Sequence, residues 1–262
     1  MAIIIKSKND LKLMRKSGRV AQRILNTLGE AAQEGTNGRD LDLLARKLLE
    51  EAGARSPFLG KKSGGPPYPC AITVSTNEAV VHGIPTLVPF VNGDIASLDV
   101  GVLLNGFIGD TAGTFAVGTP APKAERLMRV TKEALYLGIE KAVVGNTVGD
   151  ISAVIQNHVE SHGYSVVREL VGHGVGRTMH EDPNVPNFGK AGTGPKLRPG
   201  MTIAIEPMVN EGIARVKCLA DKWTYVTADG ALSAHYEHTV AVLSDGPEIL
   251  TIDDRVGNLA EV

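Results

Sequence analysis

Four acidic residues lie at matched positions in the two parts of this 262-residue chain: Asp99, Asp110, Glu206 and Glu237. Carboxylates that converge inside a protein repel one another strongly, and they need cations in order to coexist there as anions. Two divalent metal ions about 3.5–4 Å apart, bridged by carboxylates, would satisfy four such groups. The alternative is that each acid pairs with a separate Arg or Lys. The matched placement favours a shared metal site.

The first two acids flank the pair Asn105-Gly106, which is typical of a two-residue hairpin turn between alternating apolar strands. With these residues at the centre of the turn, Asp99 faces Ala112. Asp99 and Asp110 then lie diagonally on one face of the hairpin, with Cα atoms about 7–8 Å apart. Both carboxylates can therefore reach a common point.

An Asp-Gly pair separates two further predicted strands, 223–227 and 231–242, and predicts a second hairpin. Glu237 lies on the second of these strands. We therefore expect Glu237 to lie near Glu206 in the same way as Asp110 lies near Asp99. A duplicated fold would bring the two acidic pairs together.

The strands that carry the first acid of each pair follow the same pattern. Asp99 lies six residues after Gly93, and Glu206 lies six residues after Gly200. Side chains alternate faces along a strand, so the apolar residues of each strand fall on the face opposite the acid. Each carboxylate is therefore expected to lie away from the apolar face of its strand.

The helices that must position these strands are predicted by an internal repeat at an offset of 110 residues. Val20, Leu25, Ala32, Gly35, Asp40, Glu50 and Gly53 recur as Val130, Leu135, Ala142, Gly145, Asp150, Glu160 and Gly163. Each copy has the apolar spacing of two amphipathic helices. Chance is the alternative, but a duplicated α+β unit explains the helix and carboxylate matches together. We expect one domain, 1–262, with halves of about 10–120 and 121–245.

Three histidines are candidates for the same site. His173 and His180 fall in a glycine-rich segment, and His82 directly precedes a glycine. Glycines beside a histidine permit the close backbone approach that a ligand site requires. The glycine spacing does not fit a dinucleotide fingerprint. We expect the remaining histidines to be structural: His158, His162, His235 and His238.

Composition excludes several other classes. A formal charge of −2 gives no basic surface for nucleic acid, and two cysteines give no disulfide scaffold or zinc finger. No apolar run approaches the roughly 20 residues of a membrane span, and the first ten residues do not read as a secretory signal. We therefore expect a cytoplasmic protein that binds neither nucleic acid nor membrane.

Taken together, these residues resemble a type I methionine aminopeptidase along nearly the whole chain. The matching segments are 77–85, 98–111, 172–188, 202–210 and 236–239. The resemblance implies the duplicated pita-bread (creatinase/aminopeptidase) fold, an α+β fold with antiparallel sheets and paired helices outside. A type II enzyme carries a long insertion between its last two acidic ligands, whereas Glu206 and Glu237 are only 31 residues apart here.

The resemblance also implies individual metal-binding roles. Asp99 chelates one metal ion and His173 binds the other, while Asp110 and Glu237 bridge both. Glu206 binds the ion beside His173 and handles the proton of the attacking water. The implied cofactors are two divalent ions, for which oxygen and imidazole ligands suit Co, Mn, Fe and Zn alike.

Substrate contacts follow from the same resemblance. His180 would hydrogen-bond the scissile carbonyl, and His82 would contact the amide beyond it. The residues expected to form the methionine pocket are Phe58, Tyr68, Met179 and Trp223. Many bacterial relatives carry cysteines at the positions of Phe58 and Thr73, and the stretch 60–69 is also unusual. Relatives hold a monovalent cation at positions that match Asn77 and Ser233.

The implied function is removal of the initiator methionine from nascent polypeptides, at the ribosome, when the second residue is small. We expect a monomer. One alternative is a prolidase-type enzyme, an Xaa-Pro aminopeptidase, which would keep the five ligands but generally carries a large extra N-terminal domain. Another is a non-catalytic binding paralogue, which would lose metal ligands; this chain has all five.

Overall fold

The computed structural model describes residues 2–62 and 64–253; Met1, Ser63 of the unusual stretch and residues 254–262 lie outside it. The helices are α1 Lys8–Ala31, α2 Gly38–Glu51, α3 Pro122–Glu140 and α4 Val148–Ser161. The first strands are β1 Thr73–Thr76, β2 Ala79–Val81, β3 Ile95–Leu104, β4 Phe107–Ala116, β5 Ser165–Val166, β6 Gly172–Gly174 and β7 Glu181–Val185. The later strands are β8 Thr202–Ile205, β9 Met208–Asn210, β10 Val216–Cys218, β11 Tyr225–Thr227, β12 Ser233–His235, β13 Glu237–Leu243 and β14 Gly246–Ile249.

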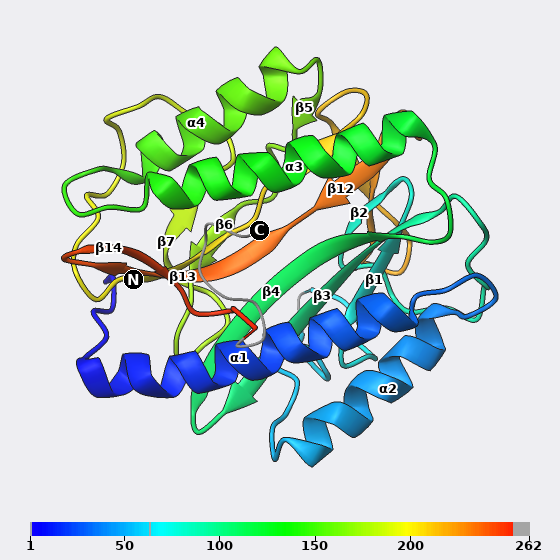
Figure 1. The fold of residues 1–262 in the computed structure, drawn as a ribbon, viewed down its shortest axis with the longest axis horizontal. Coiled ribbons are helices and arrows are strands. Elements are labelled where there is room, and N and C mark those ends of the chain that lie inside the picture. The colour runs from blue at the N-terminus through cyan, green and yellow to red at the C-terminus, as the bar shows by residue number, and fades with distance from the viewer. Residues whose placement is uncertain (1, 63, 254–262) are drawn as a thin grey trace.

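A large antiparallel sheet forms the centre of the molecule. Its strand order is β1-β3-β4-β13-β8-β6-β7, and β14 pairs with β13. Two smaller sheets, β10-β11-β2 and β12-β9-β5, complete the described strands. Figure 1 shows the long helices α1 and α3 crossing one face of the large sheet, with α2 and α4 outside them. The predicted combination of antiparallel sheets and paired outer helices is confirmed.

The second helices of the two pairs, α2 and α4, are offset by the predicted 110 residues. Asp40 and Asp150 lie in their first turns, where a carboxylate interacts favourably with free backbone N–H groups. Gly53 and Gly163 follow their last turns with φ of 61° and 82°, a left-handed conformation that suits glycine. The predicted helix pairs and their ends are therefore confirmed.

Two hydrophobic clusters lie between the sheet and the helices. One packs α1 and α2 against β3 and includes Leu98; the other packs α3 and α4 against β8 and β13 and includes Ile203. The apolar faces of both acid-bearing strands thus point to the helices and leave the opposite face for polar side chains. The division into halves 10–120 and 121–245 stays a prediction.

The second predicted hairpin is wrong. β11 pairs with β10 and β2, while the following segment splits into β12, which pairs with β9, and β13, which joins the large sheet. The split lies beside Pro207, which has no N–H to continue a strand ladder and separates β8 from β9. The Asp229 carboxylate instead accepts hydrogen bonds from the N–H groups of Ile213 and Ala231 at 2.8 and 3.1 Å. Local turn chemistry was therefore not enough to set strand pairing.

None of the described helices combines the length and the apolar character needed to cross a lipid bilayer.

Candidate metal centre and substrate cavity

Three of the acids lie in one row across the large sheet. Asp99 faces Ala112 across β3 and β4, the predicted register, and Ala112 faces Glu237 across β4 and β13. Glu206 directly follows β8, and Ile205 pairs with His238 across β8 and β13. Glu206 therefore lies opposite Glu237. This neighbourhood was expected from the sequence, but the large sheet creates it rather than a hairpin.

Asp110 and His173 come from the adjacent row. The Thr239 hydroxyl accepts a hydrogen bond from the Asp110 N–H at 3.0 Å and donates one to its carbonyl at 2.8 Å. Thr239 faces Ala204, and Ala204 faces His173. Small side chains between the two ends leave room in the middle. All five predicted ligands thus lie in two neighbouring rows of one sheet.

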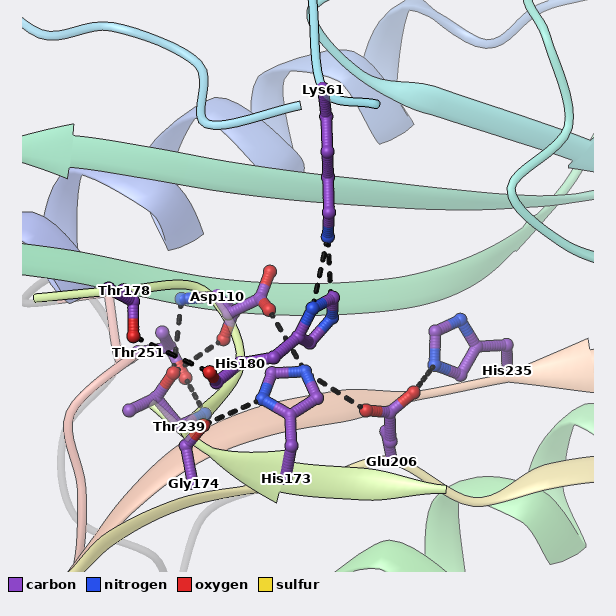
Figure 2. A network of polar contacts seen from close by, with 10 residues as sticks. All are labelled: Lys61, Asp110, His173, Gly174, Thr178, His180, Glu206, His235, Thr239 and Thr251. Atoms are coloured by element: carbon purple, nitrogen blue, oxygen red, sulfur yellow. Dashed lines mark hydrogen bonds and ion pairs between the residues drawn. The ribbon is translucent and has the colours of Figure 1, made fainter. Parts of the chain in front are cut away.

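The side chains converge as well as the backbone. His173 Nε2 lies 3.5 Å from Glu206 Oε1 and 3.8 Å from Asp110 Oδ2 (Figure 2). Asp110, His173 and Glu237 each offer a ligand atom within 4.8 Å of the others. His173 Nδ1 donates to the Gly174 carbonyl at 2.9 Å, so the proton resides on Nδ1 and the Nε2 lone pair faces the acids.

Burial controls the charge state of this cluster. Burial raises the pKa of Asp110 to about 7, and burial together with the Asp110 charge raises the pKa values of Asp99, Glu206 and Glu237 well above those of ordinary carboxyls. Burial lowers the pKa of His173 to about 3, so its imidazole is neutral. Burial therefore favours the protonated, neutral forms of these acids, whereas a bound cation would favour their carboxylates.

The donors present fit divalent metal ions. Buried oxygens of Asp99, Asp110 and Glu237 have no hydrogen-bond partner among the described residues. Such atoms carry a desolvation cost of about 1–3 kcal/mol each when left unmet. Four carboxylates and one neutral imidazole form a mixed oxygen and nitrogen set that suits Mn, Fe, Co or Zn. Two bridged ions would satisfy the free oxygens.

A cavity of about 570 Å³ opens above the five ligands. Its lining includes all four predicted pocket residues together with Thr73: Phe58, Tyr68, Thr73, Met179 and Trp223. The Tyr68 and Trp223 rings meet edge to face, with centroids 5.2 Å apart. The Tyr68 hydroxyl donates to the Ile72 and Gly83 carbonyls, and Trp223 Nε1 donates to the Pro66 carbonyl. Because backbone groups satisfy their polar atoms, the rings offer apolar surface to the cavity.

His180 and His82 also line this cavity. The His180 ring lies nearly perpendicular to the His173 ring, with centroids 4.4 Å apart. His82 follows β2 with φ of 59°, a conformation that costs energy for a residue with a side chain and is common at functional sites. Burial, and next the charge of Lys61, lowers the pKa of each to about 4, so both are neutral at pH 7.

The sequence interpretation missed two residues in the site. Lys61 Nζ lies 3.1 Å from His180 Nδ1 and 3.5 Å from its Nε2, and Figure 2 shows the side chain reaching down toward the cluster. Burial lowers the Lys61 pKa, although the nearby acids oppose this. His235 Nε2 lies 3.7 Å from Glu206 Oε2. The unusual 60–69 stretch was the signal for the lysine, and alternation with Glu237 was the signal for the histidine.

Asn77 and Ser233 are neighbours, as the monovalent-cation prediction requires. The Ser233 N–H donates to the Asn77 carbonyl at 2.9 Å. The Asn77 amide donates to Asp94 Oδ1 at 2.8 Å, and the Ser233 hydroxyl bonds Asn210 Oδ1 at 2.9 Å. Cation binding there stays a prediction.

The fold and the site together define a class of protein. The sequence profile of Metallopeptidase family M24 matches residues 12–244. The chain therefore belongs to metallopeptidase family M24. The prolidase structure from Pyrococcus horikoshii OT3 shares the fold, with a TM-score of 0.77 at 24% identity over 96% of this chain and 64% of that one. The expected pita-bread fold is thereby confirmed.

Within that family the chain groups with the methionine aminopeptidases. It is 51% identical over 250 residues to the methionine aminopeptidase of Clostridium perfringens, which covers 95% of this chain and 99% of the relative. The crystal structure of methionine aminopeptidase from Rickettsia prowazekii matches with a TM-score of 0.93 at 38% identity, over 96% of this chain and 100% of that one. The predicted resemblance is confirmed.

Proposed function

We propose that this enzyme removes methionine from the N-terminus of proteins whose second residue is small. One observation supports this proposal above all. The five candidate ligands line one cavity whose wall is rich in apolar and aromatic residues, and Asp110, His173 and Glu237 offer ligand atoms within 4.8 Å of one another. The floor suits metal-assisted hydrolysis, and the wall suits an unbranched apolar side chain.

Five side chains would hold two divalent ions: Asp99, Asp110, His173, Glu206 and Glu237. Glu206 completes the shell on the side of His173, from which its Oε1 lies 3.5 Å away. The native metal is one that accepts this mixed set, which includes Mn, Fe, Co and Zn.

The chain's own groups then carry the proton transfers and the orientation of substrate. The bound ions supply Lewis-acid polarisation and a lowered pKa for the attacking water. Glu206 accepts the proton of that water and returns it to the leaving amine. His180, neutral at pH 7, donates to the scissile carbonyl as its oxygen gains charge. His82 contacts the next amide, and the aromatic wall excludes bulk water.

The selectivity for methionine is assigned to Phe58, Tyr68, Met179 and Trp223. These side chains surround the cavity, and Phe58, Tyr68 and Trp223 also pack on one another around Cys70. A flexible thioether fits such a wall because it adapts to aromatic surfaces. Phe58 and Thr73 replace the cysteines expected from bacterial relatives, so the outer contacts of the substrate differ here.

The cellular setting follows from the proposed reaction. Initiator methionine is removed where proteins are synthesised, so we place the enzyme in the cytoplasm, acting on nascent N-termini at the ribosome as a monomer. A monovalent cation beside Asn77 and Ser233 belongs to the same proposal.

The test compares two tripeptides with chelator-treated enzyme to which Co, Mn, Fe, Ni or Zn is added back. We expect release of methionine from Met-Ala-Ser, and much slower release of the N-terminal alanine from Ala-Pro-Ala. Glu237→Ala, which removes a bridging ligand, serves as the inactive control. Failure with every metal would overturn the proposal, and faster cleavage of Ala-Pro-Ala would reassign the enzyme as a prolidase.

A further inference from the structure

A second cluster of metal-binding residues lies away from the catalytic cavity. Glu133 on α3, His158 on α4 and His162, which caps the C-terminal end of α4, each offer a ligand atom within 4.8 Å of the others. His158 Nε2 lies 3.1 Å from Glu133 Oε2, and the two imidazole centroids are 4.5 Å apart. None of the three lines the cavity above the acids.

The helices explain this convergence. His158 lies in the last turn of α4 and His162 caps its end four residues later, so their imidazole rings stand side by side. His162 Nδ1 donates to the His158 carbonyl at 2.7 Å, which places the proton on Nδ1 and leaves Nε2 with its lone pair. Arg126 on α3 donates to the His162 carbonyl at 3.0 Å and fixes the end of α4 against α3.

The third residue is oriented as well. Arg129 Nη1 donates to Glu133 Oε1 at 2.9 Å, so Glu133 presents its other oxygen to His158. The His158 side chain is 18% exposed and the Glu133 side chain 39% exposed. An ion from solvent can therefore reach the cluster without a change in the fold.

We propose that Glu133, His158 and His162 form a surface site for a divalent transition metal that links α3 to α4. Two imidazoles and one carboxylate, with water in the fourth position, are a ligand set that zinc accepts in tetrahedral geometry. Imidazole ligands disfavour Mg²⁺ and Ca²⁺, which prefer oxygen. This site is independent of the catalytic assignment.

The experiment uses Zn²⁺ alone as the probe. Equilibrium dialysis of the full chain, followed by elemental analysis, should show one zinc fewer per chain in His162→Ala than in the wild type. Titration calorimetry should show at least a tenfold loss of affinity at that site. Equal stoichiometry and affinity in the two proteins would overturn the proposal.

A matched variant sharpens the result. Asn157→Ala, an exposed change beside His158, should leave binding unchanged. A loss in Asn157→Ala equal to that in His162→Ala would contradict a site built from these three side chains. So would an anomalous map at the zinc edge without a peak between α3 and α4.

Discussion

The charge of the catalytic cluster is set by a few buried side chains. Asp110 and Glu237 are each 2% exposed, and several of the cluster's oxygens have no partner among the described residues. Without metal ions, protons and the nearby Lys61 ammonium group are the means of neutralising them. Metal binding therefore competes with protonation, and the metal-free protein should be sensitive to pH.

Asp110→Asn tests this coupling through stability. Burial raises the Asp110 pKa from 3.8 to about 7, so the folded chain holds that proton more tightly than the unfolded chain does. The contribution of protonated Asp110 to folding stability is fully present below about pH 3.8 and is lost as the pH rises through 7. At pH 8 the metal-free variant should melt roughly 5 °C above the metal-free wild type, because an amide carries no charge.

Lowering the pH checks the sign of that effect. The difference in melting temperature between the variant and the wild type should shrink toward pH 5, where Asp110 takes up its proton. Added Mn²⁺ should reverse the order at pH 8, since the variant lacks a bridging ligand. A difference that does not change with pH would contradict the assigned pKa.

Lys61 supplies a second prediction at this scale. Its ammonium group interacts with Asp110, Asp99 and Glu206, and so opposes the arrival of a dication. Lys61→Met should raise the affinity of the metal-free chain for Mn²⁺ by roughly fivefold to tenfold in calorimetry. Lys62→Met is the matched control, because Lys62 lines the same cavity but is exposed. Equal effects of the two substitutions would argue against a specific role for Lys61.

Individual residues differed in how far their positions could be predicted. Asp99 and Asp110 were predictable because an Asn-Gly turn fixes the register of a short hairpin. The position of Lys61 could not be predicted, because this residue lies in a loop that has no periodic sequence pattern. His235 was judged structural because a lone histidine is usually structural; its alternation with Glu237 was the only local signal, and its place beside Glu206 depends on the tertiary fold.

At the scale of elements, the contact between α1 and β4 holds the first acidic hairpin in place. Gly109 on β4 approaches Gly18 on α1 so closely that a Cβ at Gly109 would lie 2.5 Å from the Gly18 backbone nitrogen. Backbone atoms cannot move aside as a side chain can. Glycine is therefore required at this crossing.

Gly109→Ala should accordingly destabilise the chain by about 1–3 kcal/mol in urea unfolding, the usual cost of overpacking. Gly113→Ala is the control, four residues along the same strand, where a Cβ would meet only side-chain atoms at 3.4 Å or more. That variant should stay within about 0.5 kcal/mol of the wild type. Similar losses in both would mean that strand flexibility, not the helix contact, is responsible.

Elements were predicted well where the pattern was local. The repeat at an offset of 110 residues located α2 and α4, because the apolar spacing of a helix and the glycine at its C-terminal end are local patterns that can be recognised in the sequence. Strand pairing in the second half was not predictable in the same way. β13 pairs with β4 and β8, which are distant in sequence, and the break at Pro207 diverts β12 into another sheet.

At the scale of the whole molecule, one sheet brings together ligands from both parts of the chain. Asp99 and Asp110 come from β3 and β4, whereas His173, Glu206 and Glu237 come from β6, the end of β8 and β13. Neither set surrounds a metal pair alone. Membership of family M24 agrees with this arrangement, since the profile spans residues 12–244 and so includes all five.

The account rests on those five side chains binding metal ions in common, and an anomalous-difference map from crystals grown with Co²⁺ tests this most directly. We predict two peaks about 3.5–4 Å apart above the sheet, within coordinating distance of Asp99, Asp110, His173, Glu206 and Glu237. A map with no peak near these residues, from crystals of protein that releases methionine with Co²⁺ in solution, would contradict it.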